Sequence, residues 1–145
     1  MRINRSVIAA GFVALIGTTA FAAGDITAAA ADDPAGTITP AFKEVIANIP
    51  GKSIVAIVVD YPPGGKTPPH HHAQSAFVTG YVLSGEIRSQ VDGGAARVYR
   101  AGEHWTEIPG AHHGVSENAS ATQPAKLLAI FVLDSTETDL TTIER

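Results

Sequence analysis

Cysteine is absent from this chain of 145 residues, so disulfides cannot stabilise its fold and the packing of a core has to do so. Charged residues are also few, at 17%, and they form no basic stripe. With a net charge of −4, nucleic acid is not an expected partner. The chain has no internal repeat and is long enough for one domain only. Its 14 glycines and 9 prolines, with 45% apolar residues, indicate a compact, turn-rich fold.

The N-terminus has the pattern of a secretory signal peptide. Arg2 and Arg5 precede an apolar run over residues 7–23, which ends in the small-residue sequence Ala20-Phe21-Ala22. The run is too short and too weakly hydrophobic for a membrane span. We therefore expect residues 1–22 to be cleaved near Ala22. The mature protein would be periplasmic or secreted, with no membrane contact after cleavage.

The rest of the chain divides into three parts by composition. Residues 23–40 are rich in Ala, Asp, Thr and Pro and are expected to form a flexible lead. Residues 41–134 are expected to form the folded domain, and residues 135–145 a polar C-terminal tail. At the start of the domain, residues 41–49 suit a short helix that Pro50-Gly51 would end.

The domain itself carries the pattern of an all-β fold. Short apolar or alternating runs are separated by turn residues, with Asp92-Gly93-Gly94 as a strong hairpin signal. The expected strands cover residues 53–59, 76–83, 86–91, 96–99, 104–108, 113–116 and 126–133. Such spacing is typical of a sandwich or a barrel. Phe77 and Tyr81 are expected in its core.

All six histidines lie between positions 70 and 113. Side chains alternate between the faces of a strand, so His70 and His72 should point to one side and His71 to the other. Only one of the neighbours His112 and His113 can join the first pair, and His113 is our choice. Three imidazoles could hold one divalent metal ion and leave open coordination positions, as catalytic sites do. A solvated histidine-rich turn is the alternative interpretation.

These residues resemble the two motifs of the cupin family. The first motif is matched by Gly64, His70, His72 and Gly85, and the second by Gly102, Pro109, Gly110, His113 and Asn118. The similarity covers about residues 50–134 and implies a double-stranded β-helix, the jelly-roll barrel of small bacterial cupins. It also implies His70, His72 and His113 as metal ligands. A homodimer formed through edge strands is plausible by the same resemblance.

The family's glutamate ligand is missing, because its possible places hold Ala76, Phe77 and Val78. A divalent ion held by neutral imidazoles alone keeps its full charge in a partly dry cavity, which is costly.

Glu107 is therefore our candidate for a nearby carboxylate. It could bind the metal, orient an imidazole or act as acid or base, although a solvated carboxylate at the rim is an equal alternative. Gln74, His112 or water could instead complete the ligand set. Trp105 shares the strand face of Glu107 and could wall the cavity or fill the core, whereas His104 should be exposed.

We expect a metal-dependent enzyme that acts on a small organic substrate as an oxygenase, isomerase or cyclase. The alternatives are a non-catalytic module that binds a small molecule or metal, and a barrel whose histidines have lost their role. A protein that folds outside the cytoplasm takes up its metal there, and the affinity order then favours Zn or Cu over Fe, Mn or Ni.

Overall fold

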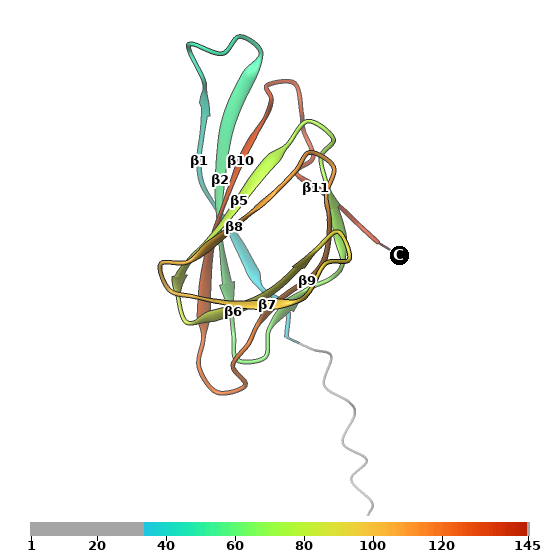
Figure 1. Cartoon of the computed structure of the whole chain (residues 1–145). Helices are drawn as coiled ribbons and strands as arrows, with labels where there is room; N and C mark the ends of the chain where they lie inside the picture. The colour runs from blue at the N-terminus through green and yellow to red at the C-terminus, as the bar shows by residue number, and fades with distance from the viewer. Residues whose placement is uncertain (1–33, 145) are drawn as a thin grey trace, which may run out of the picture.

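The computed structural model describes residues 34–144, and these fold into eleven β-strands without any helix (Figure 1). The strands are β1 (Thr37–Val45), β2 (Lys52–Tyr61), β3 (Lys66–Thr67), β4 (His70–His72), β5 (Phe77–Ser84), β6 (Glu86–Val91), β7 (Arg97–Arg100), β8 (His104–Glu107), β9 (His112–Asn118), β10 (Ala125–Asp134) and β11 (Thr141–Ile143). Within this range nothing helical is long and apolar enough to cross a membrane.

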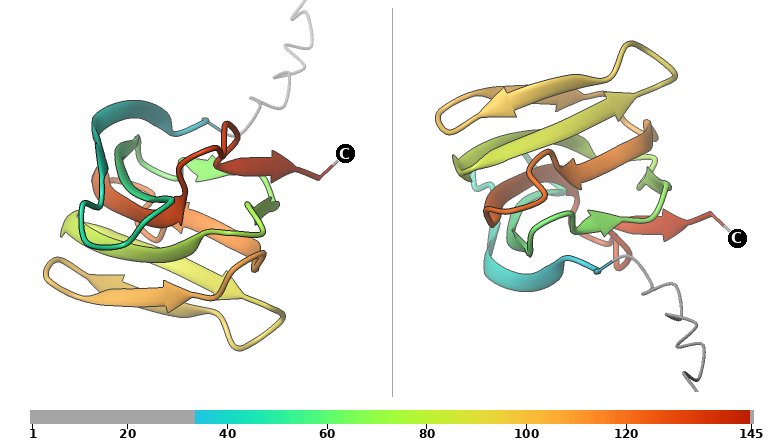
Figure 2. Two further views of the ribbon diagram at one scale, coloured as in Figure 1. Left: turned by 90° about the horizontal axis from the view of Figure 1, so that it is seen from above. Right: turned by 90° about the horizontal axis from the view of Figure 1, so that it is seen from below.

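The strands form two antiparallel sheets that enclose one interior. One sheet has the order β1-β2-β10-β5-β8 and the other β11-β4-β9-β6-β7, with β3 paired to β9 outside that path. Figure 2 shows the two sheets as facing layers, and Figure 1 shows the β1–β2 hairpin extending beyond them. Strands distant in sequence are neighbours in both sheets, so the interior collects side chains from most of the chain. This arrangement is a double-stranded β-helix.

The core follows from alternation along the central strands. In β10 every second residue from Ala125 to Leu133 is buried, and the residues between them are partly or fully exposed. The largest completely buried side chains come from four strands, β2, β5, β6 and β10, and are Tyr61, Val78, Val82, Ile87, Phe131 and Leu133. Each such side chain contributes roughly 1.5–3 kcal/mol by leaving water. The expected strands and the Asp92-Gly93-Gly94 hairpin are therefore confirmed, with ends shifted by a few residues.

The prediction of a helix over residues 41–49 is wrong. Residues 37–45 form strand β1, which pairs along the edge of β2 with a bulge between Pro40 and Phe42. The apolar spacing of this segment suits a helix locally, but β2 offers a row of unpaired backbone groups that β1 satisfies. Residues 37–40, expected in the flexible lead, belong to the same strand. The signal peptide of residues 1–22 and residues 23–33 of the lead lie outside the described residues.

The C-terminal segment also differs from the expected polar tail. Residues 141–143 form β11, which pairs with β4 and extends the second sheet (Figure 2). The pairing places Thr142 opposite His71. A short polar strand carries almost no periodic signal in its sequence, and its pairing depends on the exposed edge of β4.

Phe77 and Tyr81 were expected in the core, and this prediction is wrong. They are 43% and 39% exposed on the outer face of β5, whereas Val78, Gly80 and Val82 point inward. Gly80 is required at its position, because a Cβ there would lie 2.4 Å from Cζ2 of Trp105. Gly80 thus makes room for the indole of Trp105. Because side chains alternate along β5, the register that places Gly80 inside places Phe77 and Tyr81 outside.

Candidate functional site

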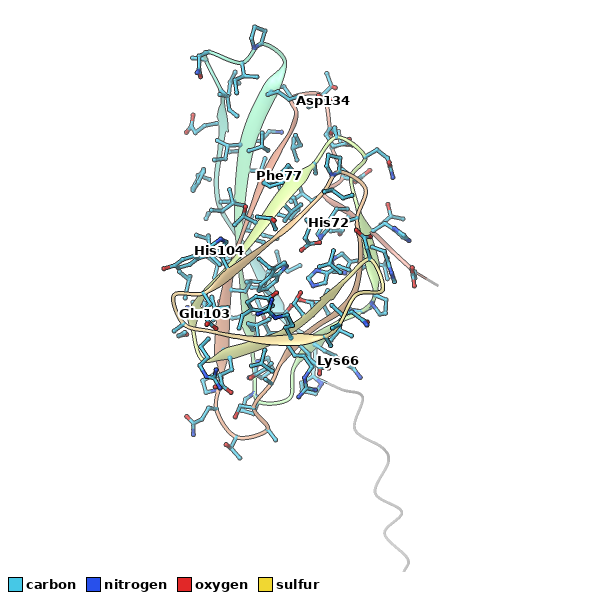
Figure 3. All side chains as sticks on the ribbon, viewed as in Figure 1. Lys66, His72, Phe77, Glu103, His104 and Asp134 are labelled. Carbon is cyan, nitrogen blue, oxygen red and sulfur yellow. The ribbon has the colours of Figure 1, made fainter. Side chains whose placement is uncertain are left out.

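Three histidines converge inside the barrel. His70 and His72 point inward from β4, His113 points inward from β9, and all three are buried. The ring centroids lie 4.9 Å apart for His70 and His72, 5.1 Å for His70 and His113, and 5.8 Å for His72 and His113. One nitrogen of each ring lies within 4.8 Å of the others, so the three could hold a metal ion. Figure 3 labels His72 within the barrel.

Local geometry explains why these rings meet. His70 stands directly opposite His113 in the β4–β9 pairing, and His72 follows two residues after His70 on the same face. The turn that delivers β9 contains Gly110 in the left-handed region, with φ of 73°, which glycine adopts without strain.

Two of the rings are oriented by neighbours behind them. His70 Nδ1 donates to the Pro68 carbonyl at 2.8 Å, which leaves its Nε2 without a proton when the ring is neutral. His113 Nε2 lies 2.8 Å from the Ser89 hydroxyl. Such partners fix the tautomer and angle of a metal-binding imidazole. The sequence analysis missed Ser89, whose only signal was its inward position in the alternating strand β6.

Glu107 faces the histidines from the opposite sheet. Its carboxylate is buried, and Oε1 accepts a hydrogen bond from Trp105 Nε1 at 2.9 Å. Oε2 lies 2.9 Å from His72 Nε2, and Oε1 lies 3.4 Å from His113 Nδ1. The alternative of a solvated rim carboxylate is therefore wrong. Trp105 both walls the cavity and donates to Glu107.

His72 and Glu107 share an uncommon feature. His72 Nδ1, His72 Nε2 and Glu107 Oε2 are all buried, and none has a hydrogen-bond partner among the described residues. Buried polar atoms without a partner are costly, and such an atom calls for a ligand or ion. In a tetrahedral zinc site with bonds of 2.0–2.1 Å, neighbouring donor atoms lie about 3.3 Å apart. The distances from the Glu107 carboxylate to His72 Nε2 and His113 Nδ1, 2.9 and 3.4 Å, are close to that value.

The other residues considered for the ligand set lie elsewhere. His112 is half-buried on the outer face of β9, and His104 is exposed as expected. Gln74 is exposed, and its amide lies over Gly110, where a Cβ would meet it at 2.6 Å. Asn118 of the second motif is buried and donates to the carbonyls of Pro62 and Gln123, which is a structural role.

The protonation states suit metal binding near neutral pH. Burial lowers the pKa of His113 to about 4 and also lowers the pKa of His70, so both rings are neutral and keep a lone pair. Burial alone would raise the pKa of Glu107, but the His72 and His113 rings and the Trp105 N–H outweigh it and leave that pKa below its ordinary value. The site therefore presents neutral imidazoles at His70 and His113 and an ionised carboxylate at Glu107.

A small cavity of about 60 Å³ adjoins these groups. This is room for about two water molecules, at roughly 30 Å³ each. Its apolar wall includes Val78, Trp105, Leu127 and Phe131. Among the described residues that line it, Glu107 is the only carboxylate, and none is Lys or Arg. Ile38 of β1 and Thr141 of β11 also line it.

Several solved structures share the fold. An uncharacterized conserved protein with a double-stranded β-helix domain from Klebsiella pneumoniae is 18% identical with a TM-score of 0.59, and the match covers 77% of this chain and 88% of that one. The cupin domain of Schizosaccharomyces pombe Cnp3 is 18% identical with a TM-score of 0.55, covering 68% of this chain and 61% of that one.

Recombinant oxalate oxidase in complex with glycolate is 26% identical with a TM-score of 0.58, covering 78% of this chain and 57% of that one. The matched region is thus less than two thirds of both oxalate oxidase and the Cnp3 domain. No curated protein matches this chain in sequence. The family model of the cupin domain matches residues 57–131, more than half of the chain, and the chain therefore belongs to the cupin family.

Proposed function

We propose that the barrel binds one divalent metal ion through His70, His72 and His113, with Glu107 as the fourth ligand. The observation that carries the proposal is the pair of buried atoms His72 Nε2 and Glu107 Oε2, which face each other at 2.9 Å without hydrogen bonds. An ion that both atoms bind would satisfy each of them. Glu107 takes over the charge of the glutamate that the first cupin motif lacks here.

The metal is proposed to be zinc or copper, with iron, manganese and nickel as alternatives. The N-terminal pattern supports export to the periplasm or the medium, where metal uptake follows the affinity order. Three imidazoles and one carboxylate suit these ions. Metal analysis of untagged protein from its own compartment tests this assignment, and finding only iron or manganese would contradict it.

We further propose that the centre is that of an enzyme acting on a very small organic substrate. A bound metal would supply a Lewis acid, or a site that activates water or dioxygen. The protein's own side chains shape the site. Trp105 fixes the Glu107 carboxylate, and the apolar wall excludes water. Glu107 is also the one carboxylate, among the described residues that line the cavity, that could take a proton from a substrate.

The cavity limits the substrate by size and charge. Its volume of about 60 Å³ admits only a few heavy atoms unless β1 or β11 moves. One carboxylate ligand leaves a divalent ion with a net charge of +1, which suits a small monoanion such as a short carboxylic acid. The similarity to an oxalate oxidase that binds glycolate supports this substrate class.

A matched pair of variants tests the centre. Glu107→Gln should lower metal affinity by at least roughly tenfold, because it removes the ligand charge and keeps the shape. Glu103→Gln, which changes an exposed carboxylate near the start of the same strand, should bind as the wild type does. Anomalous scattering should place the ion between the three imidazoles. Equal affinity of both variants, or an ion elsewhere only, would overturn the ligand set.

The second candidate function is a binding module without catalysis. The small cavity is equally compatible with this function, since a metal and a short acid can bind there without reacting. Metal-loaded protein incubated with acids of two to four carbons separates the two functions: oxygen uptake or product formation supports the enzyme, and binding without turnover supports the module. The homodimer expected from the resemblance stays a prediction, which sedimentation equilibrium can test.

A further inference from the structure

The outward-facing histidines of β4 and β9 form a second cluster. His71 stands opposite His112 in the β4–β9 pairing, on the face away from the barrel interior. Their ring centroids are 4.8 Å apart with an angle of 33° between the planes. This pair lies back to back with the inward pair of His70 and His113, because each strand alternates its faces.

Glu144 completes this outer cluster from the C-terminal segment. Thr142 of β11 lies opposite His71, and Glu144, two residues further, shares that face. Glu144 Oε1 lies 3.2 Å from His71 Nε2 and 3.0 Å from His112 Nε2. A single oxygen therefore sits close to both ring nitrogens, and the three ligand atoms lie within 4.8 Å of one another.

The contact with His112 is not a hydrogen bond. His112 Nε2 is shielded from solvent and has no hydrogen-bond partner in the part of the chain that the structure describes, although Glu144 is 3.0 Å away. Donor atoms around a tetrahedral zinc ion lie about 3.3 Å apart, since zinc–nitrogen bonds measure 2.0–2.1 Å. The two distances from Glu144 Oε1 to the ring nitrogens, 3.2 and 3.0 Å, are close to this ligand spacing, and His112 Nε2 lacks the alignment of a hydrogen bond.

Backbone contacts hold the ligands in place. The amide of His112 donates to Asp92 Oδ1 at 2.8 Å, and the amide of Glu144 donates to the Pro69 carbonyl at 3.0 Å. Pairing with β9 and β11 on its two edges holds β4, which carries His71. The side chains remain 35–48% exposed, so an ion would keep contact with water and lose little hydration energy.

From this geometry we infer that His71, His112 and Glu144 form a second site for a zinc or copper ion, separate from the centre inside the barrel. Two imidazoles and one carboxylate are ligands that these ions accept, with water in the remaining position. The ligands come from β4, from β9 and from the residue after β11. A bound ion therefore clamps the C-terminal strand onto the barrel.

This clamp acts on the wall of the inner cavity. Thr141 of β11 lines that cavity, so an ion bound outside stabilises one of its walls. An ion that binds only while β11 is paired with β4 stabilises that pairing, and the stabilisation grows as free metal rises above its dissociation constant. The outer site thereby links the stability of this wall to the concentration of free metal.

Calorimetric titration of the untagged, chelator-treated protein with Zn²⁺ tests the site. The double variant His71→Asn/His112→Asn should bind one equivalent fewer than the wild type. Glu144→Gln should weaken that same equivalent by at least roughly tenfold. His104→Asn, which removes an exposed histidine of β8, should leave the titration unchanged. An unchanged stoichiometry in the double variant overturns the outer site, whatever happens at the inner one.

Hydrogen exchange tests the clamp. Zn²⁺ at the outer site should slow exchange of the backbone amides of β11 at least roughly tenfold in the wild type and leave them unaffected in the double variant. Equal exchange with and without the outer ion would overturn the clamping role.

Discussion

Acid should destabilise the metal-free protein through His113. The pKa of this ring falls from 6.5 to about 4 because burial disfavours its charged form. Above pH 6.5 the ring is neutral in both the folded and the unfolded chain, and the full stability is present. Between pH 6.5 and about 4 the unfolded chain takes up a proton that the folded ring refuses. Stability is therefore lost as the pH falls through this window.

The size of the loss follows from the shift. One pKa unit corresponds to about 1.4 kcal/mol, so His113 alone should remove about 3 kcal/mol of the free energy of unfolding below pH 4. This is a large part of the ~5–15 kcal/mol that folded domains possess. The lowered pKa values of His70 and Glu107 act in the same direction.

Guanidinium unfolding of chelator-treated protein at pH 7.5, 6.5, 5.5 and 4.5 measures the effect. As the pH is lowered, the wild type should lose more free energy of unfolding than His113→Asn does. The difference between the two losses should be roughly 3 kcal/mol over the whole window. His104→Asn should follow the wild type, because that side chain is exposed. Identical pH dependence in the wild type and His113→Asn would refute the reasoning.

Three further changes test other parts of the structure. Gly80→Ala should cost about 1–3 kcal/mol and alter tryptophan fluorescence, because its Cβ would lie 2.4 Å from Trp105; an unchanged melting temperature would contradict the packing. Trp105→Phe should cost about 1–3 kcal/mol, since it leaves Glu107 Oε1 buried without its donor, and calorimetry should show weaker metal binding; unaltered stability and affinity would count against that role. If residues 1–22 are a cleaved signal peptide, N-terminal sequencing of the protein purified from its native cells or medium should begin near Ala23, whereas an intact Met1 would contradict cleavage.

Strand alternation accounts for much of what the sequence could predict. The spacing of His70 and His72 placed both on one face, and the turn at Pro109-Gly110 allowed a later strand to bring His113 beside them. Glu107 could be named from charge alone, because a divalent ion among neutral rings needs a carboxylate. Its depth in the barrel and its contact with Trp105 depended on how the two sheets face each other, which no local pattern contains.

Other features depended on neighbours that are distant in sequence. Phe77 and Tyr81 face outward because Gly80 has to face Trp105. Their hydrophobicity alone had predicted that both side chains lie in the core. β1 became a strand because β2 offered an unpaired edge. The cluster of His71, His112 and Glu144 could not be foreseen, since it requires the short polar β11 to pair with β4.

The orientation of the β4 histidines depends on the number of residues that precede this strand. β4 is only three residues long, and each residue changes sides relative to the one before it. Suppose that one residue is inserted or deleted between Thr67 and His70 while the pairing with β9 and β11 persists. His71 would then face the interior, and His70 and His72 would face solvent. The number of residues between Thr67 and His70, more than the identity of Pro68 and Pro69, therefore decides which histidines of β4 face the interior.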